Sequence, residues 1–228
     1  MNVRLHRAFR SEWLNNARTV SVWVPPDYNE SRRRYPVFYL HDGQNLFDPA
    51  TAFGGVPWGA DRTAERLILG QRIKPIILVG IANTRQRLNE YGPTGRRARG
   101  PSRAHRYGRF IVEEVKPFID RLYRTLPERH QTAIGGSSMG GLISLFLAQW
   151  HPETFGMCMA MSPSLWWDRE LILRQWPADP QWLRGLRLWI DMGTEEGETA
   201  GSRRMQVRRA RQLAALLESA GRKSGVDY

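Results

Sequence analysis

The sequence contains a single cysteine, Cys158, among its 228 residues. One thiol cannot form an internal disulfide, and it excludes a zinc site built on several cysteines. No apolar run approaches the length needed to span a bilayer, and the N-terminal stretch MNVRLHRAFRSEW lacks the apolar core of a signal peptide. These absences predict a soluble, cytoplasmic protein.

The chain also has too few acidic residues to balance its arginines, and its formal net charge is +12. Three segments are densely basic: Arg32–Arg34, Arg96–Arg106 and Arg203–Arg211. Such charge can attract nucleic acid or anionic surfaces. Because no nucleic-acid-binding motif accompanies it, we interpret the charge as solvated surface and expect neither a nucleic-acid nor a membrane partner.

Length and composition are those of one folded domain. Hydrophobic residues make up 41% and charged residues 25% of the chain, which is close to the average of globular proteins. A single hydrophobic core can span a chain of this size. We therefore expect residues 1–228 to form one domain.

Strand-like and helix-like apolar patterns alternate along the chain. The expected strands are Val3–Phe9, Thr19–Val24, Tyr35–Leu40, Pro75–Gly80, Thr132–Gly135, Gly156–Met161 and Leu186–Asp191. The expected helices are Ala60–Leu69, Arg106–Arg124, Met139–Trp150 and Arg203–Ala220. Pro117 should kink or end the second helix. This alternation predicts an α/β fold with a mostly parallel sheet covered on both faces, and the strand-rich start predicts an antiparallel N-terminal edge.

The stretch AIGGSSMGG contains the pattern G-x-S-x-G in one register only, centred on Ser138. In a nucleophile elbow the serine lies on a strained strand-to-helix turn, and the flanking glycines let neighbouring chain pass without β-carbon clashes. The helix N-terminus favours a developing oxyanion. We therefore predict that Ser138 is a nucleophile for acyl transfer, with the backbone N–H of Met139 as one oxyanion donor.

Several motifs together resemble one family. HDGQNLF, EYGPTG, VKPFIDRLYRTLP, AIGGSSMGG and MSPSLWWD, in this order over nearly the whole chain, are similar to the “putative esterase” family of α/β hydrolases. Its relatives include feruloyl esterases, enterobactin-type esterases, S-formylglutathione hydrolase and mycolyl transferases. The resemblance implies a three-layer α/β-hydrolase sandwich and a serine carboxyl-ester hydrolase that needs no metal or cofactor. It also implies that the Gln44 backbone N–H is the second oxyanion donor.

The acid of a catalytic triad is expected after a later strand, where LRLWIDMGTEEGE offers several carboxylates. The family pattern G-T-x-(Asp/Glu) selects Glu196, and Glu195 remains the alternative because the turn can be misaligned by one residue. Four aromatic residues, Trp58, Tyr91, Trp166 and Trp167, fall in loops at the expected active-site edge. They are candidates for stacking on a sugar or aryl group of the substrate, or equally for packing in a lid or core. Asp42 is a further substrate-binding candidate.

A serine nucleophile needs a base, and in this fold the base is a histidine that follows the acid. No histidine follows Glu196; the chain has only His6, His41, His105, His130 and His151. Helix and strand rises put His151 about 20 Å and His130 roughly 15–20 Å from Ser138. His41 lies nearer, where we expect it to fix the oxyanion loop through a hydrogen bond. Action of His41 as the base is the alternative, and His105 in its arginine-rich segment ranks below it.

The last residues, Gly225–Tyr228, have the pattern of a strand that is just beginning. In similar proteins a histidine follows that strand. We therefore expect most of an esterase-type hydrolase, incomplete at its C-terminus, with the last strand and the base missing. Acyl transfer to an alcohol at the same site is one alternative. A non-catalytic binding module on the same fold is the other.

Overall fold

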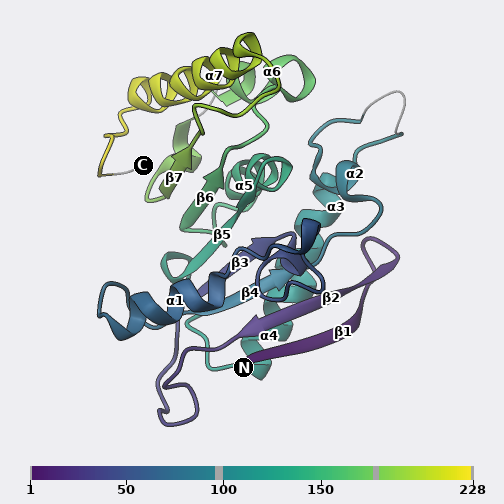
Figure 1. Cartoon of the computed structure of the whole chain (residues 1–228), viewed down its shortest axis with the longest axis vertical. Helices are drawn as coiled ribbons and strands as arrows, with labels where there is room; N and C mark the ends of the chain where they lie inside the picture. The colour runs from purple at the N-terminus through teal and green to yellow at the C-terminus, as the bar shows by residue number, and fades with distance from the viewer. Residues whose placement is uncertain (1, 96–99, 177–179, 227–228) are drawn as a thin grey trace.

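A seven-stranded sheet, with strand order β1-β2-β4-β3-β5-β6-β7, forms the centre of the molecule (Figure 1). The structure is a computed structural model that describes residues 2–95, 100–176 and 180–226. The strands are β1 (Val3–Ser11), β2 (Asn16–Trp23), β3 (Val37–His41), β4 (Ile77–Ile81), β5 (Thr132–Ser137), β6 (Met157–Met161) and β7 (Arg187–Asp191). β2 runs antiparallel to β1 and β4, and all other neighbours are parallel. The expected sheet is thus confirmed, including its antiparallel N-terminal edge.

Helices cover both faces of this sheet. The α-helices are α1 (Ala60–Leu69), α2 (Arg87–Tyr91), α3 (Ala104–Arg109), α4 (Lys116–Leu122), α5 (Met139–Trp150), α6 (Trp167–Gln175) and α7 (Ala200–Ser219). Alternate residues of β4 divide between two apolar clusters, because successive side chains of a strand point to opposite faces. Ile77 and Val79 join the larger cluster with α3, α5 and α7, whereas Leu78 joins the smaller one with α1. The expected three-layer architecture is therefore confirmed.

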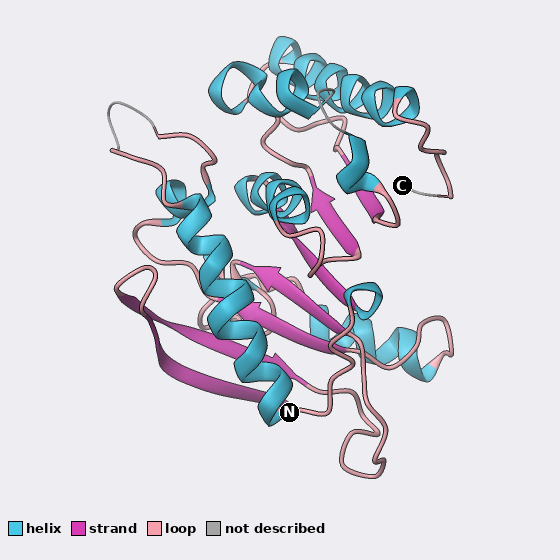
Figure 2. Ribbon diagram, turned by 180° about the vertical axis from the view of Figure 1, so that it is seen from behind, coloured by secondary structure: helices cyan, strands magenta, loops and turns pink. Residues whose placement is uncertain are grey.

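The expected helix over Arg106–Arg124 is present as a nearly continuous rod, seen crossing the sheet in Figure 2. α3 passes into a π-helical segment, η3 (Phe110–Val115), and then into α4. Pro117 lies in the first turn of α4, where the missing N–H and the fixed φ of proline are tolerated. The proline therefore neither ends nor breaks the rod, since the wider π turn precedes it.

The strand expected at the C-terminus is not present in the described residues. Residues 224–226 form a turn and not the start of a strand, and Asp227 and Tyr228 lie outside the described residues. Residues 96–99 of the second basic segment also lie outside them. Within the described residues β7 is an edge strand of the sheet. The short α2, and α6 with its left-handed Asp168, Arg169 and Glu170, were not predicted.

None of the helices within the described ranges combines the length and the apolar character that crossing a membrane requires.

A close backbone contact joins the loop after β3 to β4. A β-carbon added to Gly43 would overlap the carbonyl carbon of Gly80, and one added to Gly80 would lie 2.7 Å from Leu46 Cδ1. Only glycine allows this approach. The turn η1 (Gly43–Asn45), which carries Gln44, is therefore pressed directly onto the sheet.

We expect Gly43→Ala to destabilise the protein by about 3 kcal/mol, because the methyl group must displace β4 backbone in a packed interior. Urea denaturation measures the change. Gly201→Ala is the matched control: its β-carbon would meet nothing closer than Thr199 Oγ1 at 3.8 Å, and alanine is the better helix former. A Gly43→Ala variant as stable as Gly201→Ala would contradict the close contact.

Candidate active site

Ser138 lies alone between β5 and α5, on the turn that the sequence predicted. Its backbone has φ 58° and ψ −120°, a conformation that L-residues rarely adopt. The residue is exposed, whereas Met139 and Gly140 after it are buried. The strand, strained serine and helix N-terminus thus form the geometry of a nucleophile elbow.

The flanking glycines lie where the chain is tightly packed. A β-carbon on Gly136 would lie 3.0 Å from the Gly140 carbonyl carbon and 3.1 Å from His41 Cβ. One on Gly140 would lie 3.2 Å from the same His41 atom. The turn around Ser138 therefore packs closely against the end of β3, and a side chain at either glycine would force its neighbours to shift.

Three hydrogen bonds join Ser138 to the loop after β6. The Ser138 N–H donates to the Met161 carbonyl at 2.9 Å, and the Ser164 N–H donates to the Ser138 carbonyl at 3.1 Å. The two hydroxyl oxygens, Ser138 Oγ and Ser164 Oγ, lie 3.2 Å apart. This segment is the MSPS part of a motif that resembles the esterase family, and its contact with Ser138 was not predicted from the sequence.

The candidate oxyanion loop, residues 42–46, is held in place by polar contacts with residues that follow β4. Asp42 begins it in the left-handed region, with φ 56°. Its carboxylate accepts hydrogen bonds from Arg87 Nε at 2.8 Å and Arg87 Nη2 at 2.7 Å, and from Asn83 Nδ2 at 2.7 Å. The Gln44 side chain accepts from the Asn83 N–H at 3.0 Å. Asn83 therefore anchors both ends of the segment that positions the Gln44 backbone.

The charge of Asp42 is stabilised although the residue is buried. Burial raises the pKa of the Asp42 carboxyl, but the hydrogen bonds and charge of Arg87 outweigh it and lower that pKa overall. Both carboxylate oxygens are occupied by these partners. Asp42, a candidate for substrate binding, is thus engaged in holding the loop.

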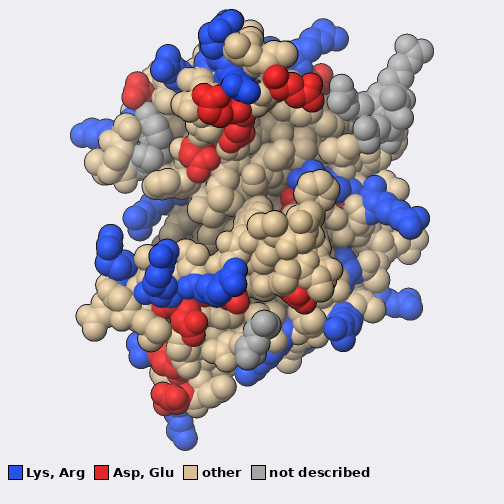
Figure 3. All heavy atoms as spheres, in the orientation of Figure 1, with Lys and Arg blue, Asp and Glu red and all other residues tan. Residues whose placement is uncertain are grey.

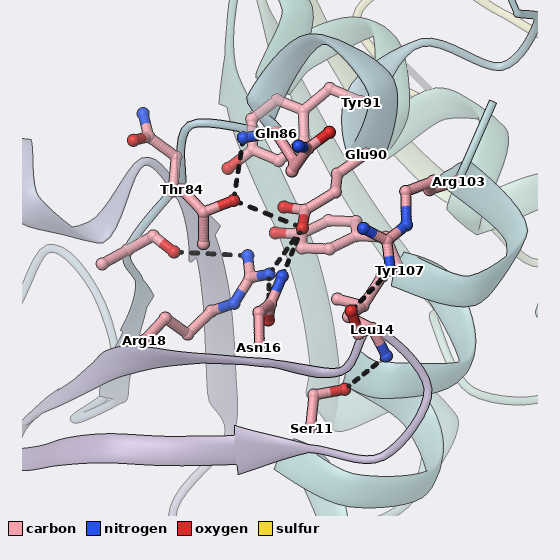
Figure 4. A network of polar contacts seen from close by, with 12 residues as sticks. Ser11, Leu14, Asn16, Arg18, Thr84, Gln86, Glu90, Tyr91, Arg103 and Tyr107 are labelled. Atoms are coloured by element: carbon pink, nitrogen blue, oxygen red, sulfur yellow. Dashed lines mark hydrogen bonds and ion pairs between the residues drawn. The ribbon is translucent and has the colours of Figure 1, made fainter. Parts of the chain in front are cut away.

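A buried ion pair fixes the helix that carries Arg87 (Figure 4). Arg18 Nη2 lies 2.9 Å from Glu90 Oε1, and both side chains are almost fully buried. Asn16 and Thr84 donate to the same carboxylate oxygen at 2.9 and 3.3 Å. This network ties α2 to β2, and removal of either ion would leave an uncompensated buried charge.

His41 is buried at the end of β3, behind the Ser138 turn. Its Nδ1 is 2.9 Å from the hydroxyl of Tyr107 on α3, so the expected hydrogen bond to the oxyanion loop itself is absent. The loop instead receives Tyr91, whose hydroxyl accepts from the Asp42 N–H at 3.2 Å. Burial lowers the pKa of His41 to about 3. A ring with so low a proton affinity is poorly suited to act as a base near pH 7.

The other four histidines all lie within the described residues, away from Ser138. His6 contacts the Tyr123 hydroxyl at 2.7 Å, and His105 stacks on Trp150 with ring centroids 3.8 Å apart. His151 follows the far end of α5, and His130 precedes β5, at the end opposite to Ser138.

The loop after β7 directs its two neighbouring glutamates to different sides. Glu196 Oε1 accepts from the Gly193 N–H at 3.1 Å and from the Ser162 hydroxyl. Glu195 turns toward α7, where its carboxylate pairs with Arg203 at 2.6 Å. Glu196 is thus the glutamate bound to the loop that also contacts Ser138. Among the described residues, no three His, Cys, Asp or Glu side chains form a group that could hold a metal ion.

The four aromatic candidates divide into two exposed and two buried residues. Trp58 is 38% and Trp166 40% exposed, whereas Tyr91 and Trp167 are buried in the core. Tyr91 and Trp167 therefore correspond to the packing alternative.

Figure 3 shows one face of the molecule, which is hollowed between the part formed by α7 and the part formed by α1 and its neighbouring loops, with acidic side chains on the α7 side.

A cavity of about 280 Å³ adjoins the candidate oxyanion loop on the side of β1 and β2. Its walls include Gln44 from the loop, Phe47 just after it, and Val3, Leu5 and Ser21 from the strands. The volume is at the lower limit of ligand pockets, so it accommodates one small group.

Together, the sheet and the turn around Ser138 define a protein of the α/β-hydrolase type. The family described as “Putative esterase” matches residues 11–227. The chain belongs to that esterase family, as the motifs indicated.

Relatives with named activities are esterases. The chain is 28% identical over 177 residues to the iron(III) salmochelin esterase of Escherichia coli O6:H1, covering 70% of this chain and 39% of the relative. It is 29% identical over 179 residues to the ferri-bacillibactin esterase BesA of Bacillus subtilis, covering 71% and 59%. The chain thus spans less than two thirds of the length of either relative.

Solved structures share the fold. The enterobactin esterase FES from Shigella flexneri superposes with a TM-score of 0.74 at 22% identity, over 95% of this chain and 51% of that one. This likeness shows the fold alone. Family and fold together confirm the prediction of an esterase-type α/β hydrolase and class the chain among ester hydrolases.

The buried His41 should make stability depend on pH. Its pKa in the folded protein, about 3, lies below the ordinary value of 6.5. Between these values the unfolded chain binds a proton that the folded chain does not, so stability falls as pH falls from 6.5 toward 3. The slope from one such group is at most about 1.4 kcal/mol per pH unit.

Urea denaturation at a series of pH values from 7 to 4 measures this slope. We expect His41→Asn to reduce this slope by up to about 1.4 kcal/mol per pH unit, while the contributions of His6 and His151, whose pKa values burial also lowers, persist in both proteins. Equal slopes in the two proteins would contradict the low pKa of His41.

Proposed function

We propose that the chain acts on carboxyl esters through an acyl-enzyme on Ser138. The observation that carries this proposal is the strained, exposed serine between β5 and α5. Gln44 and Met139 would donate their backbone N–H groups to the oxyanion, and Glu196 would orient the base.

The proposed reaction has two steps. Ser138 Oγ attacks the acyl carbon while its proton passes to a base, and the carbonyl electrons move to the oxygen held by the two N–H groups. The intermediate collapses, and the alcohol leaves with that proton. Water then attacks the acyl-enzyme, the acyl–Oγ bond breaks, and the electron pair returns to Oγ, which is protonated again.

No histidine of this chain is well placed to accept the proton of Ser138. His41 is a poor base because of its low pKa, and the other four histidines lie away from the serine. Without a base, the residual acceleration from oxyanion stabilisation and binding is about 10³–10⁴ over water. We therefore infer slow ester hydrolysis by the chain alone, which added imidazole should accelerate if it supplies the base.

We further propose a small ester with an aromatic group as substrate. Relatives are named for salmochelin, bacillibactin and feruloyl esters, and a ligand of one similar structure is 2,3-di-hydroxy-N-benzoyl-serine. The exposed rings of Trp58 and Trp166 are each able to stack on such a group. The expected absence of nucleic-acid and membrane partners and a cytoplasmic location belong to this proposal.

Chemical rescue tests the proposed activity. Hydrolysis of p-nitrophenyl butyrate would be followed by absorbance, with and without added imidazole, in the wild-type chain and in Ser138→Ala. Because free imidazole hydrolyses this ester by itself, Ser138→Ala supplies the background. We expect imidazole to accelerate the wild type in a saturable manner above that background. Identical rates in both proteins would instead favour a non-catalytic binding module, which the placement of the histidines also fits.

The same assay assigns the acid. We expect Glu196→Gln to lower the imidazole-rescued rate by about 100-fold or more, since an orienting carboxylate contributes orders of magnitude in a serine triad. Glu195→Gln, the same change at the adjacent exposed residue, should stay within about twofold. Equal effects of the two substitutions would make the assignment of Glu196 wrong.

A further inference from the structure

The loop Met161–Ser164 connects two parts of the candidate site that lie on different strands. At one end Ser164 contacts Ser138 through a backbone hydrogen bond and a hydroxyl contact. At the other end Ser162 donates its hydroxyl to Glu196 and its N–H to Asp191 Oδ1 at 2.9 Å. The loop thus bridges the candidate nucleophile and the candidate acid.

The bridge is held rigidly at its Ser138 end. Ser164 is only 3% exposed, and its N–H is already bound to the Ser138 carbonyl. A β-carbon on Gly141 would lie 3.0 Å from the Met161 carbonyl oxygen and 3.2 Å from Pro163 Cα. The loop therefore packs against the first turn of α5, and the Ser164 hydroxyl has little freedom to move away from Ser138.

The backbone of the loop is strained at its other end, at Ser162. Ser162 has φ 42°, in the left-handed region that disfavours a serine. Such a conformation persists only where surrounding contacts require it, and it is often found at functional sites. Here it accompanies a residue whose backbone N–H contacts the carboxylate of Asp191, at the end of β7, and whose hydroxyl contacts Glu196 in the loop that follows.

We propose, on the basis of the function proposed above, that Ser164 is a further catalytic residue: its hydroxyl donates a hydrogen bond to Ser138 Oγ during acyl transfer. Ser138 must direct its own proton to the base when it attacks, so its oxygen is then free to accept. The hydrogen bond fixes the Oγ rotamer and stabilises the negative charge that Oγ bears as its proton passes to the base during attack, and again when the acyl–Oγ bond breaks. Ser164 keeps its own proton throughout.

The test is the reaction of Ser138 with a p-nitrophenyl alkylphosphonate in the presence of imidazole. Oγ attacks phosphorus, p-nitrophenolate leaves, and intact mass reports the adduct. Saturation kinetics separate the first-order rate constant from the concentration for half-saturation. We expect Ser164→Ala to lower the rate constant about tenfold, as for the loss of one hydrogen bond to a charged group, and to leave half-saturation within twofold.

Ser144→Ala is the matched control. Ser144 is also a fully buried serine beside the turn, but its hydroxyl donates to the Gly140 carbonyl at 2.7 Å and does not contact Ser138. Both substitutions remove the Oγ of a buried serine, so the two variants lose the same atom from similarly buried positions. A purely structural role for Ser164 predicts that both variants change the thermal unfolding temperature and that neither changes the rate constant selectively.

The outcomes separate the two proposals. If wild type forms the adduct, Ser138→Ala does not, and Ser164→Ala reacts as fast as Ser144→Ala, the role of Ser164 is overturned while Ser138 remains a nucleophile. If wild type forms no adduct that depends on Ser138, the proposed function and the inference built on it both fail. A selective loss in Ser164→Ala, with folding intact by circular dichroism, supports the inference.

Discussion

The left-handed backbone of Ser138 is the constraint on which the candidate site depends. A residue held at φ 58° returns to an ordinary conformation unless its neighbours prevent it. Here the Met161 carbonyl and the Ser164 N–H hold both sides of its peptide units, and the first turn of α5 continues from it. The exposure of the serine hydroxyl therefore results from fixed neighbours and not from a flexible loop.

The candidate oxyanion loop depends on a second constraint of the same kind. Gly43 approaches the β4 backbone so closely that the distance between the loop and the sheet is fixed. The Asp42–Arg87 ion pair fixes the orientation of the loop. Arg87 in turn belongs to α2, which is anchored by the buried Arg18–Glu90 pair. A chain of polar contacts thus extends from β2 to the loop that carries Gln44, and each contact sets the position of the next.

Sequence patterns predicted the parts of this structure that depend on apolar periodicity and glycine spacing. α1 and α5 coincide with their predicted ranges, and the turn at Ser138 follows from G-x-S-x-G. The pattern could not predict that Asp42 is clamped by Arg87, because their contact depends on how the loops after β3 and β4 meet in space. Nor could it separate Tyr91, which is buried, from Trp58, which is exposed, since both stand in aromatic, glycine-containing segments.

The order of strands explains why the serines of the loop after β6 matter. β6 lies between β5, which ends at Ser138, and β7, which precedes Glu196. The ends of these two outer strands are two strand spacings apart, about 9.5 Å. In the mechanism proposed above, the base would stand between Ser138 and Glu196. The loop Met161–Ser164 joins the same two residues, since Ser164 contacts Ser138 and Ser162 donates its hydroxyl to Glu196.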